Sequence, residues 1–481
     1  MRVSQIFGLQ KTQFELDFVD IDPDSDTTLF LDPYYIAKSE FAFAINAHRT
    51  LRSFFSFLLN LLNQDKINQA REIFSYLGEP NETCLGFSEN HPEGKGVGPT
   101  DTEKIFESLL QSKAVKTGLM EDIEDFRIFV PGIDKDKMSD MTTNIIRKHL
   151  IDYTQNQCRL WGMPLQANVP SGYYWARKKR EWVNEYTEML IINGKKILLV
   201  PKRIVSFSKV YTPQKYLQHF VLNFLQNEHL RLNTNLVQIK KYKSGREEPY
   251  VTKKSVKYSV GDIDKDWLAK FTQDHPEVFK DFRERSAKSL KVVLNEDIGD
   301  GTLCDIIQYL REKLLSIPSG NQDATMYHRT VIGILELLFY PSLSSPQVER
   351  EIHEGRKRID ITFDNSAERG FFFRLNSVYN TPSQFIMVEC KNYSRDVENP
   401  ELDQLSGRFS PNRGKFGLLL CRTINDMDLF LKRCSDTYKD DRGVIIPLVD
   451  QDLINMLEGF MEQGSQVWES LLMDRFRRIA L

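Results

Sequence analysis

The chain has 481 residues, of which 41% are hydrophobic and 27% are charged, and its formal net charge is −3. This length exceeds what one hydrophobic core usually serves, so two or three domains are expected. No apolar run approaches the roughly 18 residues of a membrane span, and the N-terminus lacks the apolar core of a secretory signal. We therefore expect a soluble, cytoplasmic globular protein with no membrane partner.

Charge is distributed unevenly along the chain. Residues 171–260 contain 18 Lys and Arg but only 6 Asp and Glu, a local net charge of +12. A basic block in an otherwise acidic chain predicts a surface that binds a polyanion.

The six cysteines show no zinc or disulfide pattern. None forms a CxxC pair or has a histidine at zinc-ligand spacing. We expect free, mostly buried thiols in a reducing cytoplasm. They are Cys84, Cys158, Cys304, Cys390, Cys421 and Cys434.

The first 245 residues predict a mixed α/β region. Asn193-Gly194 between two apolar runs is typical of a tight β-hairpin. Ser139 or Asp140 is a candidate N-cap of a helix. The expected strands are 14–18, 28–31, 188–192 and 196–200, and the expected helices are 47–62, 100–110, 142–155 and 213–226.

Residues 246–321 form the expected connector between this region and a C-terminal domain at 322–481. Residues 241–260 are charged and poor in apolar side chains, which favours a linker or an exposed arm. Residues 264–318 predict helices interrupted near 295–301.

The C-terminal domain predicts alternating helices and strands in the order αβββαβαβα. Such an order implies a mixed sheet between helices. The expected helices are 326–340, 401–409, 426–438 and one from 451, and the expected strands are 359–363, 370–375, 385–390, 416–421 and 444–449.

Two of these strands carry acidic residues. The strand Phe385–Cys390 ends in Glu389-Cys390-Lys391, so that Glu389 and Lys391 share one face and Cys390 takes the other. The strand RKRIDITF carries Asp360, and the preceding helix GILELLFYPSL carries Glu336.

This ordered set resembles the PD-(D/E)xK superfamily of restriction-endonuclease-like nucleases over residues 322–455. The chain departs from the pattern in two places. Ile359 rather than proline precedes Asp360, and the interval between Asp360 and Glu389 has room for an extra strand, FFFRL. The resemblance implies a restriction-endonuclease-like mixed sheet flanked by helices, preceded by a larger mixed α/β region.

The resemblance also implies a metal site. Asp360, Glu389 and the backbone carbonyl of Cys390 supply the oxygen ligands that Mg²⁺ prefers, with Mn²⁺ as an alternative ion. A bound metal would lower the pKa of a water molecule beside the scissile phosphate. Lys391 would orient that water or stabilise the developing charge.

Two further side chains are candidates for the same site. Glu336 would bind a second metal or a water molecule, and Gln404 on the following helix resembles a polar residue that some members place beside the site. The alternative interpretation is that the charged residues on these strands form structural ion pairs.

Basic residues next to aromatic ones suggest contacts with nucleic acid. Arg and Lys would meet phosphates while aromatic rings stack on bases. The alternative is a helix with a solvated basic face and a buried aromatic face. The candidates are Tyr174, Trp175, Arg177, Lys178, Lys179 and Arg180, together with Arg356 and Arg358 just before Asp360.

We therefore expect a Mg²⁺-dependent deoxyribonuclease, an endonuclease that hydrolyses phosphodiester bonds of DNA in prokaryotic restriction or antiphage defence. Its expected partners are DNA and a second copy of the chain or another protein of the defence system. The alternatives are a nucleic-acid-binding or interaction protein with an inactive nuclease-like domain, and an RNA-cleaving effector.

Overall fold

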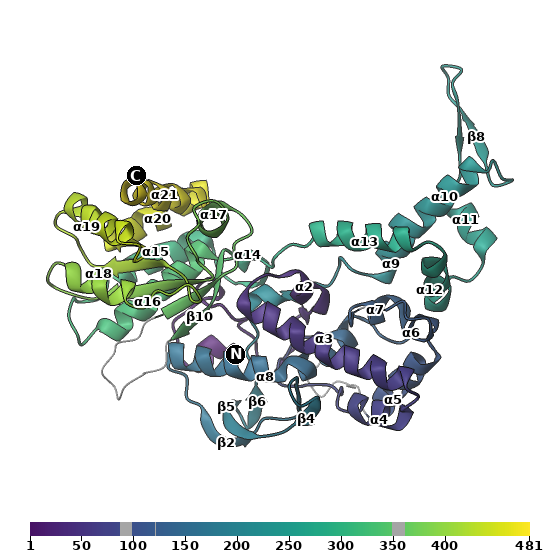
Figure 1. The fold of residues 1–481 in the computed structure, drawn as a ribbon, viewed down its shortest axis with the longest axis horizontal. Helices are drawn as coiled ribbons and strands as arrows, with labels where there is room; N and C mark the ends of the chain where they lie inside the picture. The colour runs from purple at the N-terminus through teal and green to yellow at the C-terminus, as the bar shows by residue number, and fades with distance from the viewer. Residues whose placement is uncertain (87–98, 121, 349–360) are drawn as a thin grey trace.

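A computed structural model describes residues 1–86, 99–120, 122–348 and 361–481. The chain forms an N-terminal lobe, a C-terminal lobe and a projecting arm (Figure 1). Among the described helices, none combines the length and the apolar character that crossing a bilayer requires.

Two long helices, α3 and α8, organise the N-terminal lobe. In α3 the buried residues Leu51, Phe54, Phe55 and Leu58 recur every three or four positions and pack against α8. The helices of the lobe are α1 (Val3–Ile6), η1 (Gln13–Glu15), α2 (Pro33–Lys38), α3 (Ala42–Asn63), α4 (Ile67–Phe74), α5 (Pro99–Gln111), α6 (Lys113–Lys116), α7 (Asp125–Phe129), α8 (Lys135–Trp161) and η2 (Lys202–Ile204).

The helix α8 is longer than the sequence predicts. Its N-cap is Asp134, whose side chain accepts a hydrogen bond from the Lys137 N–H at 3.0 Å. Ser139 and Asp140, the predicted caps, lie inside the helix and are buried. The helix ends at Gly162, which adopts a positive φ of 75°.

Small sheets flank these helices. The predicted hairpin is confirmed, because β5 and β6 are joined through Asn193 and Gly194, both with positive φ. The predicted strand at 14–18 is wrong, since a 3-10 turn occupies Gln13–Glu15. The strands are β1 (Phe30–Leu31), β2 (Gln166–Pro170), β3 (Tyr174–Ala176), β4 (Glu181–Val183), β5 (Tyr186–Ile192), β6 (Lys195–Ile197) and β7 (Val205–Ser206).

Residues 213–288 form the arm and its return to the lobe. The hairpin of β8 (Gln238–Lys241) and β9 (Glu247–Tyr250) is exposed along its whole length and projects from the molecule (Figure 1). The predicted arm at 241–260 is therefore confirmed for the hairpin, whereas residues 253–260 form the helix α11, in which Val256 is buried. The helices here are α9 (Pro213–Tyr216), the π-helical turn η3 (Leu217–Val221), α10 (Leu222–Arg231), α11 (Lys253–Val260), α12 (Lys265–Asp274) and α13 (Pro276–Lys288).

The predicted connector divides between the two lobes. Helix α12 packs on α6 and α7 of the N-terminal lobe, and α13 reaches the same lobe through the contact of Phe279 with Phe129, whereas α15 packs on α16 and α20 of the C-terminal lobe.

The C-terminal lobe is built on a five-stranded mixed sheet of order β10-β11-β12-β13-β14. The first three strands are antiparallel, and the last three are parallel. Its strands are β10 (Leu343–Val348), β11 (Ile361–Asn365), β12 (Phe385–Lys391), β13 (Phe416–Cys421) and β14 (Val444–Val449). Its helices are α14 (Asn295–Ile298), α15 (Leu303–Ser316), α16 (Ala324–Phe339), α17 (Gly370–Ser377), α18 (Asn399–Ser406), α19 (Met427–Lys439), α20 (Asp450–Gln463) and α21 (Gln466–Ala480).

One predicted strand of this lobe is wrong. Gly370–Leu375 belongs to the helix α17, in which Phe371, Phe372 and Leu375 are buried at helical spacing. Leu343–Val348 forms the missing strand instead. As an edge strand it accommodates Pro346 and a bulge near Ser345, which has a φ of 53°. The mixed α/β class is confirmed, with α17 inserted between β11 and β12.

Candidate active site at the end of strand β12

Strand β12 ends in a cluster of buried charged side chains. Glu389 and Lys391 are each only 2% exposed. Lys391 forms an ion pair with Glu389 Oε1, and its Nζ donates a hydrogen bond to Gln404 Oε1 of α18 at 3.0 Å. The structure therefore brings together three of the residues that the sequence predicts to share a site.

The two faces of β12 carry different chemistry, as strand alternation predicts. Glu389 and Lys391 lie on the face that α18 covers. Cys390 lies on the α16 side near Tyr327, whose pKa is raised well above its ordinary value by burial and by Asp450. Tyr327 also donates a hydrogen bond to Asp450 at 2.8 Å.

Arg408 completes the cluster and is a residue that sequence reasoning missed. Its Nη1 lies 2.5 Å from Glu389 Oε2, and its side chain is only 9% exposed. Arg408 follows Gly407, the residue that ends α18, so one short segment supplies both Gln404 and Arg408. In the sequence, Gln404 and Arg408 are related only by their spacing of four residues, and this spacing alone does not indicate a site.

A carboxylate held between two buried cations has two chemical uses. Removing one partner of a buried ion pair leaves the other charge uncompensated. Each member of the cluster therefore contributes to the stability of this end of the sheet. The same carboxylate is a ligand type that Mg²⁺ prefers. Among the described residues, no group of three or more acidic, histidine or cysteine side chains is arranged to hold a metal ion.

Three of the predicted site residues lie outside the described part of the chain. They are Asp360, Arg356 and Arg358, within 349–360. The described part of β11 begins at Ile361, which pairs with Val388, the residue before Glu389.

Glu336 does not join the cluster at β12. Helix α16 leads into the start of β10, where Leu343 pairs with Asn365, whereas Glu389 adjoins the opposite end of the same strands. Glu336 is 1% exposed, and neither of its carboxyl oxygens accepts a hydrogen bond from the described residues. Burial and the charge of Asp17 raise the pKa of this carboxyl well above the usual range, which favours its neutral form.

Glu336 instead belongs to a buried polar network between the two lobes. Asp17 accepts hydrogen bonds from the Tyr153 hydroxyl at 2.5 Å and from the Ser345 N–H of β10 at 3.0 Å. Lys202 donates to Asn295 Oδ1 at 2.7 Å, and burial lowers its pKa to about 8. These hydrogen bonds thus join residues that are far apart in the sequence, and Asp17 and Lys202 are both completely buried.

Asp364 gives this interface a predicted pH dependence. Burial raises its pKa to about 7, although the Phe43 N–H donates to it at 3.4 Å. From about pH 4 to 7 the folded protein keeps a proton that the unfolded chain loses, so this contribution to stability falls as pH rises. Asp364→Asn, which retains an acceptor, should therefore raise the melting temperature more at pH 8 than at pH 5. Equal shifts at both pH values would contradict the assignment.

The predicted nucleic-acid residues form a β-hairpin rather than a helix. Arg177, Lys178, Lys179 and Arg180 form the turn between β3 and β4 and are exposed. Trp175 is only 2% exposed and packs edge-on against Phe54, with ring centroids 5.2 Å apart. The four basic side chains are thus available to a ligand. Trp175, in contrast, is a core residue whose ring cannot stack on a nucleobase. Tyr174 is also buried, at 8% exposure.

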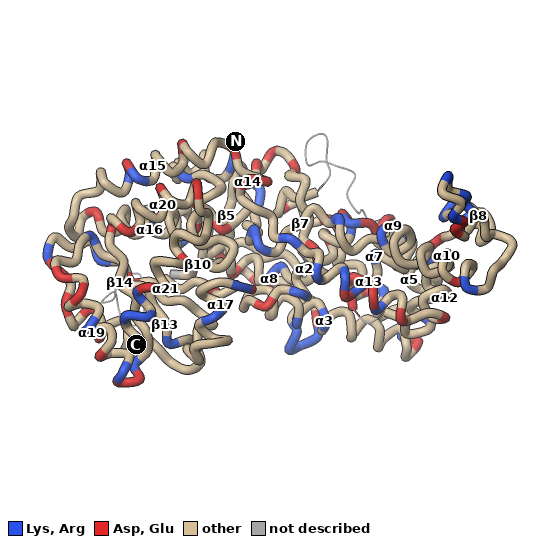
Figure 2. The backbone as a smooth tube through the Cα atoms, turned by 90° about the horizontal axis from the view of Figure 1, so that it is seen from above, with Lys and Arg blue, Asp and Glu red and all other residues tan. Residues whose placement is uncertain are grey.

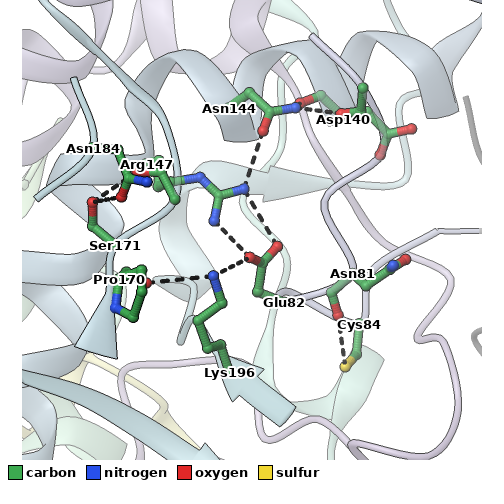
Figure 3. Close-up of polar contacts among 12 residues, drawn as sticks. Asn81, Glu82, Cys84, Asp140, Asn144, Arg147, Pro170, Ser171, Asn184 and Lys196 are labelled. Atoms are coloured by element: carbon green, nitrogen blue, oxygen red, sulfur yellow. Dashed lines mark hydrogen bonds and ion pairs between the residues drawn. The ribbon is translucent and has the colours of Figure 1, made fainter. Parts of the chain in front are cut away.

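A polar network fixes the neighbouring segments to α8 (Figure 3). Arg147 donates to Glu82 at 2.7 Å and to Asn144 at 3.1 Å, and Arg147 is the largest cause that lowers the Glu82 pKa. Lys196 of β6 approaches the same carboxylate at 3.5 Å. Gly172 has a φ of 75°, and a Cβ there would lie 3.0 Å from Arg147. This close packing holds the N-terminal part of the hairpin in place.

One family model matches part of the chain. Residues 8–212 match the model of a family described as Domain of unknown function (DUF8370). The match spans the N-terminal lobe as far as β7 and its neighbouring loop, and it leaves out the arm and the five-stranded sheet. Neither the curated proteins nor the solved structures give a match.

Proposed function

We propose that the C-terminal lobe is a Mg²⁺-dependent endonuclease that hydrolyses phosphodiester bonds of DNA. The observation that carries this proposal is the convergence of Glu389, Lys391 and Gln404 at the end of β12. This strand lies at the centre of the sheet, where antiparallel pairing changes to parallel pairing.

The donor types fit Mg²⁺ or Mn²⁺. Glu389 and the Cys390 carbonyl supply oxygen ligands, and Asp360, which precedes Ile361 in the chain, is assigned as the second carboxylate. The metal when bound supplies a water of lowered pKa and positive charge beside the phosphate. Glu336 is left out of this site, because it lies in the buried network between the lobes.

The neighbouring side chains have separate roles in the proposal. Lys391, held by Glu389 and Gln404, positions its ammonium group beside the scissile phosphate. Arg408 holds the other oxygen of Glu389 and so fixes the orientation of the carboxylate. Glu389 would be the carboxylate that holds the metal, and the Lys391 ammonium would then be available to the substrate.

Two basic surfaces support DNA as the substrate. The β8–β9 arm carries exposed Lys240, Lys241 and Lys243, seen as a basic tip in Figure 2. The β3–β4 turn carries four more basic residues. We assign the β8–β9 arm to non-specific contacts with phosphates. By analogy of architecture, we place the protein in prokaryotic restriction or antiphage defence.

A second candidate is a nucleic-acid-binding protein with an inactive nuclease-like domain. The observation that favours it is the pairing of both Glu389 oxygens with cations, Lys391 and Arg408. A carboxylate already compensated in this way has no need of a metal.

Purified protein incubated with supercoiled plasmid, linear duplex, single-stranded DNA and RNA distinguishes these candidates. We expect plasmid nicking or cutting with Mg²⁺ or Mn²⁺ and none with EDTA. Binding of DNA without cutting under every metal supports the inactive domain, and cutting confined to RNA supports an RNA-cleaving effector.

The arm makes a separate prediction about salt. Changing Lys240 and Lys243 to Ala should reduce the slope of log affinity against log salt concentration by about 1 to 2, since each lost phosphate contact removes about 0.9. Measurements with a labelled duplex at several salt concentrations test this. The matched control changes Lys432 and Lys439, exposed on α19, and should leave the slope unchanged. Equal slopes for the arm variant and the wild type would exclude the arm from DNA binding.

A further inference from the structure

A pocket of about 460 Å³ lies in the N-terminal lobe between α3, α8 and the β3–β4 hairpin. Its volume falls in the range of about 300–1,000 Å³ typical of small-molecule sites. Helix α3 contributes Asn46 and Thr50, α8 contributes Lys148 and His149, and the hairpin contributes residues 174–179.

The inner wall of the pocket is apolar and held in place by core contacts. Trp175 and Val183 line it, and Trp175 is fixed by Phe54 and by a hydrogen bond from its Nε1 to Ser53 Oγ at 3.3 Å. Because these contacts belong to the folded core, the wall is formed before any ligand arrives.

The rim of the pocket is cationic. Arg177 and Lys178 are exposed, and among the described residues neither forms an ion pair. Lys179 pairs weakly with Glu181 at 3.5 Å, and Lys148 is already balanced by Glu185 at 3.0 Å. Arg177 and Lys178 therefore project positive charge toward anything that enters the pocket.

Between wall and rim the pocket offers neutral hydrogen-bonding groups. His149 Nε2 lies 2.9 Å from Thr50 Oγ1. Burial, and secondarily Arg177 and Lys148, lower the pKa of His149, while Asp152 opposes them, so the imidazole is neutral at pH 7. A neutral His beside Asn46 suits a polar ring rather than a phosphate.

We propose that this pocket binds a nucleoside polyphosphate. The base lies in the apolar part of the pocket, at Ala176 and Val183 and within reach of His149, and the phosphates meet Arg177 and Lys178 at the rim. The apolar wall and the neutral hydrogen-bonding groups match the base, and the cationic rim matches the phosphates. The inference does not depend on the nuclease assignment, since the pocket belongs to the other lobe.

Isothermal titration of the full chain in EDTA tests the inference, with ATP, GTP, CTP and UTP as probes. We expect at least one triphosphate to bind about tenfold or more tightly than its nucleoside or than pyrophosphate alone. The proposal would be overturned if no triphosphate bound, or if every triphosphate bound no better than pyrophosphate.

Variants locate the binding. Arg177→Ala with Lys178→Ala should weaken triphosphate binding about tenfold or more. Ala176→Phe, which fills the pocket and keeps every charge, should abolish binding while circular dichroism stays unchanged. Lys432→Ala, at an exposed lysine on α19, is the control and should bind like the wild type.

A short single-stranded oligonucleotide provides the competing outcome. If it binds in an Arg177-dependent manner while no triphosphate does, the pocket belongs to a nucleic-acid track and the proposal fails. Triphosphate binding that survives Ala176→Phe would equally overturn it, because the ligand would then lie outside the pocket.

Discussion

Glu389→Gln should lower Mg²⁺-dependent DNA cleavage by about a hundredfold or more. The amide keeps the shape of the side chain but removes the charge that would bind the metal and that now pairs with Lys391 and Arg408. Loss of one group that stabilises charge at a reacting centre typically costs about a hundred- to a thousandfold in rate. Initial rates of plasmid conversion at saturating Mg²⁺ measure the effect.

Lys391→Met should reduce cleavage to a similar extent while DNA binding persists. Asp441→Asn is the matched control, because this carboxylate of the same lobe pairs with a lysine at the surface, where it is 91% exposed. Its cleavage rate should equal that of the wild type. Undiminished cutting by both the Glu389 and Lys391 variants would show that the reaction occurs elsewhere.

Lys202→Met should be the most destabilising single change in the network between the lobes. The ammonium group is completely buried, donates to Asn295 and lies 4.2 Å from the centre of the Tyr340 ring. Removing one member of a buried charged network typically costs about 3–5 kcal/mol, because its partners stay desolvated. Thermal melting of the full chain at pH 7 should show a clear decrease in melting temperature.

Glu336→Gln is the contrasting variant. Burial raises the pKa of the Glu336 carboxyl well above its usual range and so favours the neutral form, and we expect a neutral amide of the same shape to change little. Its melting temperature and its cleavage rate should both stay close to the wild type. A large loss of cleavage without a loss of stability would return Glu336 to the active site.

The sequence predicted the strands of the C-terminal sheet best where they are fully buried. Phe416–Cys421 and Val444–Val449 match their predicted limits, since continuous apolar runs between turn residues have few alternatives. The strand Phe385–Lys391 was equally clear, and strand alternation placed Glu389 and Lys391 on one face.

Prediction failed where tertiary contacts decided the outcome. The run Gly370–Leu375 has strand-forming residues, but its phenylalanines fill a space against Trp468 and Phe416 as a helix. Leu343–Val348 carries two serines and a proline that only an edge strand tolerates. Arg408 and the burial of Glu336 depend on neighbours distant in sequence, which periodicity cannot reveal.

The most direct measurement is a Mg²⁺ titration of plasmid conversion, run on wild type and Glu389→Gln purified in parallel. The proposal predicts conversion that saturates with Mg²⁺, disappears with EDTA and is lost in the variant. Wild-type protein that binds the plasmid but leaves it intact at every Mg²⁺ and Mn²⁺ concentration would contradict it, as would equal conversion by the variant.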